Sequence, residues 1–413
     1  MQEKYLLVKE KLKKYGQEQL LTKYQDFDEM TKEKFLEDVI NTDFEQILEL
    51  YKGIDTFQNK KENIIEPIKY IEKSELSEKE STFYKSIGEK IIKDGHYAVV
   101  TMAGGQGTRL GHSGPKGTFD IGLESHKSIF EILCDSIKRA SKEYGSNISW
   151  YIMTSKENNK ETIDFFESNS YFNYPKENII FFIQGELPMI DENGKIILNE
   201  NGFIKKASNG HGGIFAAIRN GAIWENMQNK GIKWIFICGV DNILVNMVDP
   251  VLVGLSIEKK VLAAGKSVAK IAPEEKVGVF CKKNGKPSVI EYTEISKEMS
   301  KEKNENGDLK YGESHILCNL FNIQAIDKLS TDKLPYHCAH KKANYMDENK
   351  NIIIAKEPNA YKFEAFLFDA FESLDDMVIM RVKREDEFAP IKNADGVDSP
   401  QTAKELYKKF YKI

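Results

Sequence analysis

The feature that most constrains this chain is a glycine-rich stretch that directly follows a short apolar run. Residues 98–102 read AVVTM and predict a buried strand, and residues 103–111 then read AGGQGTRLG. A second turn, GPKG, follows at 114–117. Clustered glycines let another group approach the backbone closely, and backbone N–H groups beside Arg109 and Lys116 attract anions. The stretch therefore predicts a loop that binds a chain of phosphates.

Two familiar phosphate-binding motifs do not fit this stretch. A P-loop needs a glycine, four residues and then Gly-Lys-Ser or Gly-Lys-Thr, but Pro115 precedes Lys116, and the GKS at 265–267 lacks its first glycine. The dinucleotide fingerprint G-x-G-x-x-G starts at Gly105 but has Leu110 in place of its third glycine. A nicotinamide-dependent oxidoreductase remains as an alternative despite this spacing. A plain strand-to-helix turn is the other alternative, but it would not need Gly104, Gly105 and Gly107 together with two cations.

Composition and charge are those of an ordinary globular protein. Of the 413 residues, 41% are hydrophobic and 30% are charged, and the formal net charge is −5, which argues against a protein that coats nucleic acid. No uninterrupted apolar stretch reaches the roughly 20 residues of a membrane span, and the charged start MQEK is unlike a secretory signal. We therefore expect a cytoplasmic protein without a nucleic-acid or membrane partner.

The cysteines and the standard catalytic motifs narrow the chemistry further. The five cysteines are scattered, odd in number and without C-x-x-C spacing. They predict isolated thiols and support neither a disulfide framework nor a zinc site. The sequence has no G-x-S-x-G, no H-E-x-x-H and no protein-kinase motif set, so it gives no support to a hydrolase or a protein kinase.

The composition of the sequence and the spacing of its apolar residues change at about residue 95. Residues 1–95 are rich in Lys and Glu, with apolar residues at helical spacing, and they predict a helical N-terminal domain. Residues 96–390 alternate short apolar runs with helical patterns, which predicts a catalytic α/β domain with a mostly parallel sheet covered on both faces. Residues 391–413 form a short C-terminal segment. The expected strands are 98–102, 149–154, 179–184, 234–240 and 261–264, the expected helices are 128–143, 160–168 and 214–226, and hairpin turns are expected at 192–195 and 283–286.

Polar residues stand where two of these strands end. Asp241 directly follows the run 234–240, so it lies at the carboxyl end of a buried strand, where ligands gather in open α/β sheets. A carboxylate there is a candidate Mg²⁺ ligand beside phosphates, and a helix cap or turn is the alternative. Gln184 ends the run 179–184, and its amide could either pair with a uracil edge or simply be exposed.

Two further positions are candidates for contact with a sugar. His211 lies between Gly210 and Gly212 and could bond a hydroxyl or a phosphate, although a histidine between glycines is more often an ordinary loop residue. Glu291 lies in VIEY at 289–292 and could accept a hydrogen bond from a sugar hydroxyl, although an outward-facing strand residue is the alternative. The local sequence leaves both positions open.

Together these residues resemble the eukaryotic-type UDP-sugar pyrophosphorylases, and among them most closely the UDP-N-acetylglucosamine pyrophosphorylases. The resemblance is carried, in order, by motifs between about residues 70 and 402. The motifs are AGGQGTRLG at 103–111, PKG at 115–117, WYIMTS at 150–155, GKIIL at 194–198, VDNILV at 240–245, VGV at 277–279 with IEY at 290–292, and REDEF at 384–388 with KNAD at 392–395. The resemblance implies a nucleotide-diphospho-sugar transferase fold, which is a GT-A or Rossmann-like mixed sheet with helices on both faces.

The resemblance also implies roles for individual residues. The loop with Gly104 and Gly105 would hold the UTP phosphates, and Gln184 would read the uracil with Gly210 beside it. Asp241 would bind Mg²⁺. Lys392 would bind the sugar phosphate. The sugar itself would be held by His211, Gly278, Glu291, Asn319, Phe366 and Phe368.

The implied activity is uridylyl transfer, in which UTP and a sugar 1-phosphate give a UDP-sugar and pyrophosphate. In-line attack on the α-phosphorus needs no covalent nucleophile, because positioning and charge neutralisation suffice, and Arg109 and Lys116 would stabilise the departing pyrophosphate. Overall similarity favours N-acetylglucosamine 1-phosphate. His211 resembles the UDP-glucose and broad-specificity enzymes instead, so glucose 1-phosphate is the alternative. A non-catalytic UDP-sugar-binding protein is the alternative of a different class, and we expect a monomer or weak oligomer.

Overall fold

The structure, a computed structural model, describes residues 1–54 and 63–413, which fall into two compact units. The small unit contains residues 1–54, Gly185–Gly213 and Leu334–Phe366. The large unit contains Asn63–Gln184, Ile214–Lys333 and Leu367–Ile413. Each unit is therefore assembled from segments that are distant in the sequence.

These units do not follow the boundaries expected from the sequence. Residues 63–95 belong to the large unit, because strands β1 (Ile65–Pro67) and β2 (Ile71–Glu72) pair there with β11 and β18, more than 200 residues later. Pairing over such a distance leaves no local periodicity in the sequence. That residues 96–390 form the catalytic domain is a statement about function, and it stays a prediction.

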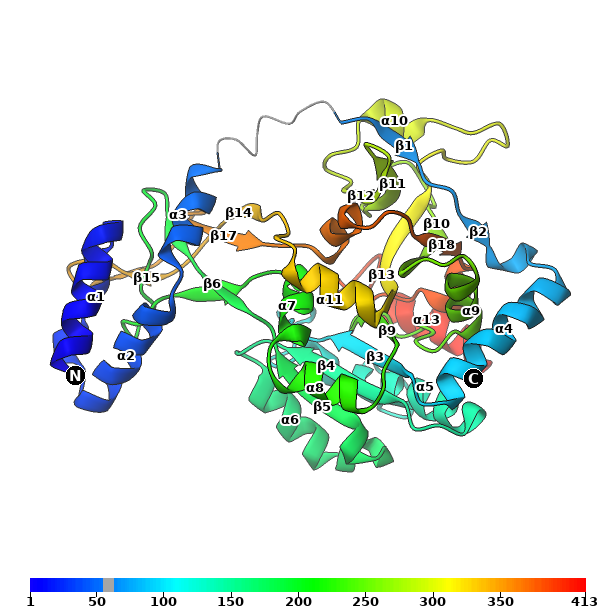
Figure 1. Cartoon of the computed structure of the whole chain (residues 1–413), viewed down its shortest axis with the longest axis horizontal. Coiled ribbons are helices and arrows are strands. Elements are labelled where there is room, and N and C mark those ends of the chain that lie inside the picture. Colours follow the sequence, from blue (N-terminus) through cyan, green and yellow to red (C-terminus); the bar gives the residue numbers. More distant parts are fainter. Residues whose placement is uncertain (55–62) are drawn as a thin grey trace. The chain divides into compact units, whose positions relative to one another are not determined.

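One mixed sheet organises the large unit. Its strands follow the order β2-β18-β10-β13-β9-β3-β4-β5, and β11 joins β13 and carries β12 and β1. Strands β9, β3, β4 and β5 run parallel, as the sequence predicts, whereas β13 runs antiparallel to both of its neighbours (Figure 1). The remaining bounds are β3 (Tyr97–Met102), β4 (Ser149–Thr154), β5 (Ile179–Ile183), β9 (Trp234–Gly239), β10 (Ala263–Ala269), β11 (Val279–Lys283), β12 (Lys286–Ile290), β13 (Glu313–Asn322) and β18 (Val378–Arg381). The α/β fold class with a mixed sheet is confirmed.

The central strands form because they are apolar on both faces, which suits a sheet that is covered by helices. Every residue of β3, β4 and β9 is buried. Helix α5 (Ile129–Tyr144) begins where the Ser128 hydroxyl accepts the Glu131 N–H, and it ends at Gly145 with a φ of 64°. The other helices of this unit are α4 (Glu78–Lys93), α6 (Asn159–Ser168), α7 (Ile214–Arg219), α8 (Ala222–Asn229), α9 (Pro250–Glu258), α10 (Lys297–Lys301), α11 (Ile323–Thr331), α12 (Arg384–Glu387) and α13 (Pro400–Tyr411).

The single helix expected over residues 214–226 is in fact two helices, α7 and α8. They are separated at Gly221, which has a φ of 72°. A residue in this left-handed region cannot continue a right-handed helix. The sequence prediction was wrong here because one glycine does little to disturb an otherwise helical pattern.

Helices α4 and α9 touch backbone to backbone. A Cβ at Gly88 would lie 1.9 Å from the carbonyl oxygen of Pro250, and a Cβ at Gly254 would lie 1.9 Å from that of Tyr84. Both helices therefore need glycine at the contact. The contact fixes the start of α9, where the Asp249 carboxylate caps the helix by accepting the Val251 and Leu252 N–H groups.

Asp249 also belongs to a buried cluster of charges. The Lys266 ammonium lies 2.9 Å from Oδ2 of Asp249 and 2.5 Å from Oε2 of Glu387, and Lys73 lies 2.7 Å from the same Asp249 oxygen. The Lys266 side chain has no exposed surface, and that of Asp249 is 2% exposed. Burial alone would raise the pKa of Asp249, but the nearby Lys266 and Lys73 charges lower it below its usual range. Burial would likewise lower the pKa of Lys266, but Asp249 and Glu387 raise it.

The small unit packs helices α1 (Gln2–Tyr15), α2 (Glu29–Asn41) and α3 (Phe44–Lys52) on short strands. The Gln17 side chain donates to the Gly194 carbonyl (3.1 Å) and accepts from the Ile196 N–H (2.8 Å), so it joins α1 to the hairpin turn expected at 192–195. The strands are β6 (Glu186–Pro188), β7 (Ile190–Asp191), β8 (Lys206–Ser208), β14 (His337–Lys341), β15 (Tyr345–Met346), β16 (Ile352–Ile353) and β17 (Ala360–Glu364).

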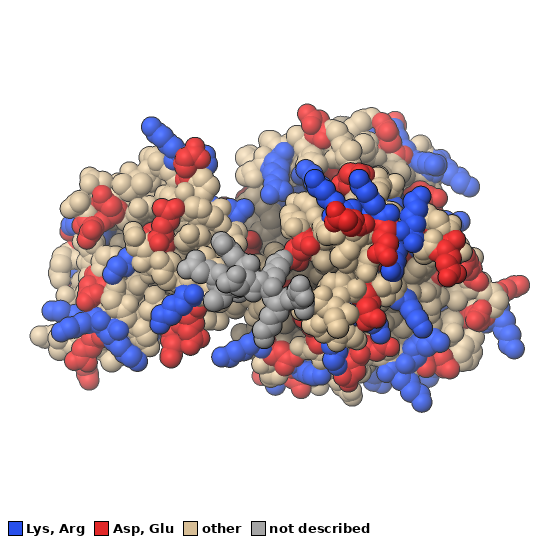
Figure 2. All heavy atoms as spheres, turned by 90° about the horizontal axis from the view of Figure 1, so that it is seen from above, with Lys and Arg blue, Asp and Glu red and all other residues tan. Residues whose placement is uncertain are grey.

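The surface mixes the two signs of charge. Basic and acidic side chains are interspersed over the face shown in Figure 2, in line with totals of 59 Lys and Arg against 64 Asp and Glu. Within residues 1–54 and 63–413, no helix combines the length and the apolar character needed to cross a membrane.

We predict that Lys266→Met destabilises the protein by about 3–5 kcal/mol, because it removes the fully buried ammonium between Asp249 and Glu387 and leaves these carboxylates only the partly exposed Lys73. Chemical denaturation at pH 7 measures this loss. Lys90→Met is the matched control: Lys90 pairs with Asp94 on the surface and is 77% exposed, so its loss should change little. Equal effects of the two variants would contradict the prediction.

The same cluster predicts a defined pH dependence. A lowered folded-state pKa of Asp249 contributes stability above its unfolded pKa of about 4, and this stability is lost as the pH falls through the folded value. The raised pKa of Lys266 contributes stability below about pH 10, and this stability is lost at higher pH. The gap in unfolding free energy between wild type and Lys266→Met should therefore be widest near neutral pH and should narrow below about pH 4. A gap that is constant from pH 3 to 7 would contradict this assignment.

Candidate functional site

The glycine-rich loop leaves the end of β3 and passes beside the end of β5. A Cβ at Gly104 would lie 3.0 Å from Oε1 of Gln184 and 3.3 Å from the Ser155 backbone nitrogen. Gln184 is 8% exposed, and its N–H donates to the Thr154 carbonyl at the end of β4 (2.8 Å). Two residues expected to bind the nucleotide, Gly104 and Gln184, are therefore neighbours.

Gly105 is the loop glycine that packing within the protein does not explain. Among the described residues, no heavy atom comes within 4 Å of the position that its Cβ would occupy, apart from its chain neighbours. Its φ is not in the left-handed region, and the residue is exposed. A glycine that neither conformation nor internal packing requires fits the close approach of a group from outside the chain.

Three other loop glycines are required by the fold itself. A Cβ at Gly107 would clash with the His112 side chain at 2.8 Å, and one at Gly117 would lie 2.2 Å from the Phe130 ring. At Gly114 the nearest atom would be Oε1 of Glu161, at 2.6 Å. The number of glycines in the sequence therefore overstates the part of the loop that is free for a ligand.

Asn158 holds the loop in place, and sequence reasoning missed it. Its side chain has no exposed surface, and its Nδ2 donates to the Ala103 carbonyl at 2.9 Å and lies 3.4 Å from the Gly105 carbonyl. Its Oδ1 accepts the Ser155 N–H at 2.9 Å. The available signal was an Asn four residues after a predicted strand, where side chains often bond the backbone.

Asp241 lies at the carboxyl end of β9, as the sequence predicts, and it contacts the Lys116 ammonium and the backbone next to Lys392. Its Oδ2 is 3.8 Å from the Lys116 ammonium, and its carbonyl accepts the N–H of Ile391 at 2.9 Å. Because Ile391 directly precedes Lys392, this hydrogen bond keeps the backbone of Lys392 near that of Asp241. The Lys392 ammonium itself lies 3.6 Å from Oδ2 of Asp398. The side chains of Lys116 and Asp241 are 17% and 27% exposed, so both can meet a ligand.

Asn242 links the end of β9 to the segment that follows α12, and sequence reasoning missed this role. Its Nδ2 donates to the Glu387 carbonyl (2.7 Å), and its Oδ1 accepts the Ala389 N–H (2.9 Å). Because the Glu387 carboxylate bonds Lys266, the buried cluster is joined to the segment that carries Lys392. The position of Lys392 therefore depends on buried contacts from three separate parts of the chain.

The donor set suits a metal that arrives with a ligand. Within residues 1–54 and 63–413, no group of three or more His, Cys, Asp or Glu side chains is arranged to hold a metal ion. Mg²⁺ commonly binds through one or two carboxylates together with substrate phosphates and water. A single partly exposed carboxylate, Asp241, beside the phosphate-binding loop fits this pattern.

Four residues expected to hold the sugar lie in the large unit. A Cβ at Gly278 would lie 3.0 Å from Oε1 of Glu291. The Gly278 carbonyl accepts the N–H of His315 (2.8 Å), whose Nε2 is 3.3 Å from the Asn319 amide and whose ring meets that of Phe368 at 5.7 Å. His315, which sequence reasoning missed, therefore connects Gly278, Asn319 and Phe368.

The other candidates gather in the small unit. Gly210 has a φ of 83°, and a Cβ there would lie 2.2 Å from the Ala365 carbonyl oxygen. The same carbonyl accepts the Gly212 N–H at 2.8 Å. The ring of His211 lies 5.4 Å from that of Phe366. Gly210 is thus fixed by its backbone conformation, while His211 and Phe366 form one aromatic pair.

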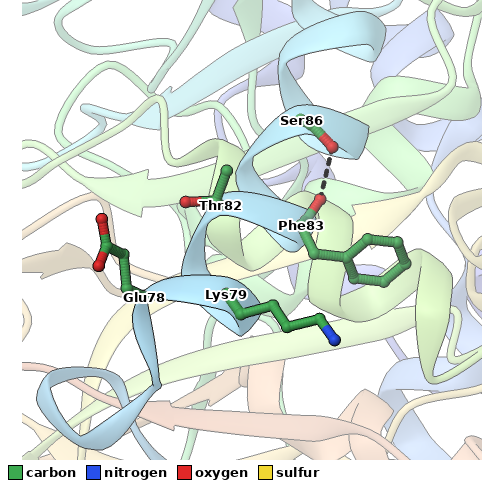
Figure 3. Close-up of a pocket in the computed structure, with 5 residues that line it drawn as sticks. All are labelled: Glu78, Lys79, Thr82, Phe83 and Ser86. Carbon is green, nitrogen blue, oxygen red and sulfur yellow. Dashed lines mark hydrogen bonds between the residues drawn. The ribbon is translucent and has the colours of Figure 1, made fainter.

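Two features lie apart from these groups. Arg109 is exposed on a single turn of 3₁₀ helix, Thr108–Leu110, so its contact with pyrophosphate stays a prediction. A shallow pocket on the outer face of α4 is lined by Glu78, Lys79, Thr82, Phe83 and Ser86 (Figure 3). It shares no residue with the candidate site.

Comparison with known proteins identifies the relatives of this chain. Residues 42–400 match the model of the UTP–glucose-1-phosphate uridylyltransferase family. The chain is 35% identical to UDP-N-acetylglucosamine diphosphorylase 2 of Arabidopsis thaliana, over 97% of this chain and 83% of that protein. It is 37% identical to the UDP-N-acetylglucosamine pyrophosphorylase of Saccharomyces cerevisiae, over 81% and 72%.

A solved structure gives the same result. The crystal structure of the uridine diphosphate N-acetylglucosamine pyrophosphorylase from Trypanosoma brucei, in complex with an inhibitor, superimposes with a TM-score of 0.82 at 32% identity. The match covers 98% of this chain and 84% of that one. The similarity therefore extends over almost the whole chain.

We predict that Gly105→Ala folds normally but binds UTP about tenfold more weakly, because its methyl group would enter space that is open in the protein and that the nucleotide would occupy if this loop binds its phosphates. Gly117→Ala is the matched contrast, and it should lose stability through its clash with Phe130. Thermal denaturation and UTP titration of both variants distinguish them. Unchanged UTP affinity in Gly105→Ala would exclude this loop as the phosphate site.

Asn158→Asp should raise the KM for UTP by about tenfold, because the carboxylate cannot donate to the Ala103 and Gly105 carbonyls and the loop loses its internal support. Steady-state kinetics with each substrate varied in turn measure this effect. Asn159→Asp serves as a neighbouring control, since the Asn159 side chain accepts a hydrogen bond from the Thr154 hydroxyl through Oδ1, an atom that aspartate keeps. If the two variants raise the KM equally, the loop-support role is wrong.

Proposed function

Because the chain belongs to the UTP–glucose-1-phosphate uridylyltransferase family, we propose that it transfers the uridylyl group of UTP to N-acetylglucosamine 1-phosphate, forming UDP-N-acetylglucosamine and pyrophosphate. Membership of this family makes the protein a nucleotidyltransferase. The names and the 35–37% identity of the relatives, over most of the chain, support N-acetylglucosamine as the sugar.

The observation that carries the proposal is the meeting of three charged positions at the end of β9. Asp241 lies 3.8 Å from Lys116 of the phosphate loop and bonds the backbone next to Lys392. A triphosphate and a sugar phosphate carry several negative charges that must come close together for reaction. The Lys116 ammonium beside Asp241, and a second lysine whose backbone neighbour bonds the same residue, support that requirement.

In the proposed reaction an oxygen of the sugar 1-phosphate attacks the α-phosphorus of UTP in line, and pyrophosphate leaves. The bond between the α-phosphorus and the bridging oxygen breaks as the new one forms. Lys116 and Arg109 stabilise the charge that develops on the departing pyrophosphate. Lys392 holds the attacking phosphate. Catalysis comes from positioning and charge stabilisation, with no covalent intermediate.

Asp241 would hold Mg²⁺ in this proposal. When bound, the ion neutralises charge on the phosphates of the nucleotide. The partly exposed carboxylate at the strand end supports this role. Asp241 would also keep Lys116 near the phosphates through their ion pair.

Base and sugar recognition are assigned to the neighbouring residues. The Gln184 amide beside Gly104 would pair with the uracil edge. Within the large unit, Gly278, Glu291, Asn319 and Phe368 would hold the sugar. Gly210, His211 and Phe366 belong to the other unit, and their roles toward the nucleotide and the sugar stay predictions from the sequence. The contacts within each unit support this grouping.

Compartment and assembly are the remaining parts of the proposal. Five free thiols fit a reducing compartment such as the cytoplasm. A monomer or weak oligomer, without nucleic-acid or membrane partners, stays a prediction that light scattering and fractionation can test.

The direct test is pyrophosphate release by wild-type protein with UTP, Mg²⁺ and a panel of sugar 1-phosphates. We expect the highest kcat/KM with N-acetylglucosamine 1-phosphate. A preference for glucose 1-phosphate would support the alternative suggested by His211. UDP-sugar binding without any pyrophosphate release would instead indicate a non-catalytic binding protein.

Lys116→Ala should lower kcat by about a hundredfold or more, because removing one preorganised charge at a transition state costs roughly 3 kcal/mol. The fold should remain intact. Lys142→Ala, an exposed lysine at the end of α5, is the control and should retain full activity. A near-normal rate for Lys116→Ala would remove Lys116 from the mechanism.

A further inference from the structure

We propose that His315 is a positioning residue that orients the Asn319 amide and thereby takes part in selecting the sugar. This inference rests on the proposed function and deepens it at the sugar end of the site. Neither the motifs of the sequence nor its local patterns indicate His315. The observations that carry the proposal are an irregularity in β13, a clamp of aromatic rings and a contact between two polar side chains.

The contact between His315 and Asn319 needs an unusual backbone. Residues four apart in a regular strand lie about 13 Å apart. In the antiparallel pairing of β10 with β13, Gly265 pairs with Asn319 and Ser267 pairs with His315. Two residues along β10 therefore correspond to four along β13. Midway between His315 and Asn319, Leu317 has a φ of 54°. Such bulges redirect side chains and recur beside active sites.

The bulge brings the two polar groups together. His315 Nε2 lies 3.3 Å from both Oδ1 and Nδ2 of Asn319, so the His315 tautomer decides which of the two atoms it bonds, and the backbone N–H of His315 donates to the Gly278 carbonyl at 2.8 Å. Asn319 has no exposed surface, whereas His315 is only half-buried. His315 is therefore the member of the pair that is open to its surroundings, and Asn319 is the member that it holds.

Aromatic rings fix the orientation of the imidazole. The ring of His315 stands nearly perpendicular to those of Phe280 (4.9 Å, 83°), Phe368 (5.7 Å, 86°) and Phe371 (5.9 Å, 88°). Three edge-to-face contacts restrict rotation of the ring, so Nε2 stays directed at Asn319. Phe368 is itself one of the residues assigned to the sugar pocket, which places the clamp beside the sugar.

The pair has a clear chemical consequence. An amide can turn either its oxygen or its nitrogen toward a neighbour, and the tautomer of His315 decides which of the two it meets. Asn319 is fully covered in this structure, so the sugar would reach it only after ligand binding moves the side chains around it, and the Asn319 group that it would then meet is an acceptor in one case and a donor in the other. Sites with a fixed donor and acceptor pattern discriminate strongly between sugars that differ in one polar substituent.

The test compares His315→Gln with His315→Leu. A glutamine amide can reach the position of Nε2, whereas leucine fills the space without a hydrogen bond. We expect His315→Leu to raise the KM for the preferred sugar 1-phosphate by about tenfold and to change the ratio of kcat/KM between N-acetylglucosamine and glucose 1-phosphates. The KM for UTP should stay within about twofold, and His315→Gln should restore most of the loss.

A second pair of variants tests the proposal even if His315→Leu disturbs folding. His315→Asn is polar but too short to reach Asn319, so it should behave like leucine while His315→Gln behaves like wild type. His126→Gln, an 82% exposed histidine in the large unit, is the control. An unchanged KM and sugar preference in both His315→Leu and His315→Asn would overturn the proposal, as would equal changes in the KM for UTP. Wild-type protein that releases no pyrophosphate with any sugar 1-phosphate would overturn the proposed function, and this inference with it.

Discussion

The large unit depends on one buried ionic contact, that of Lys266 with Asp249 and Glu387. Lys266 lies on β10, Asp249 caps α9, and Glu387 ends α12, so a single ammonium joins a strand and two helices. Charges this deeply buried are costly unless each is matched. The cluster therefore tolerates little displacement of any of its members, and it fixes the segment that follows α12.

That segment carries Lys392, the cation proposed to bind the sugar 1-phosphate. The Glu387 carbonyl accepts a hydrogen bond from the Asn242 side chain. The Ile391 N–H donates to the Asp241 carbonyl at the end of β9. The phosphate loop reaches the same point through Lys116. A buried core thus supports the proposed active site, whose charged side chains Lys116, Asp241 and Lys392 are partly exposed. Such support is needed because misplacing a reacting group by about 1 Å can cost two orders of magnitude in rate.

Much of this could be predicted from the sequence, for identifiable reasons. The strands of the parallel half of the sheet are continuous apolar runs, and Asp241 directly follows one of them, so both were visible locally. The antiparallel insertion of β13, the break at Gly221 and the two discontinuous units were not, since they depend on pairings and conformations that leave no local pattern. Gly107 and Gly117 were attributed to a ligand, but they are explained by the internal contacts with His112 and Phe130.

The residues that sequence reasoning missed share one property. Asn158, Asn242 and His315 act on other parts of the protein through hydrogen bonds, and an isolated Asn or His is too common in sequences to reveal such a role. The residues that they bond lie as many as 147 positions away from them in the sequence, as with Asn242 and Ala389. The residues proposed to bind substrate were predicted from motifs, whereas the residues that contact and position them were visible only in the structure.

The central claim is that buried contacts act on catalysis by holding Lys392 against the end of β9. A double-mutant cycle of Asn242→Ala with Lys392→Ala, measured on kcat for uridylyl transfer at saturating substrates, tests it most directly. If Asn242 acts through Lys392, Asn242→Ala should lower kcat in wild type but have little further effect once Lys392 is gone. Losses that multiply independently in the double mutant would contradict the account.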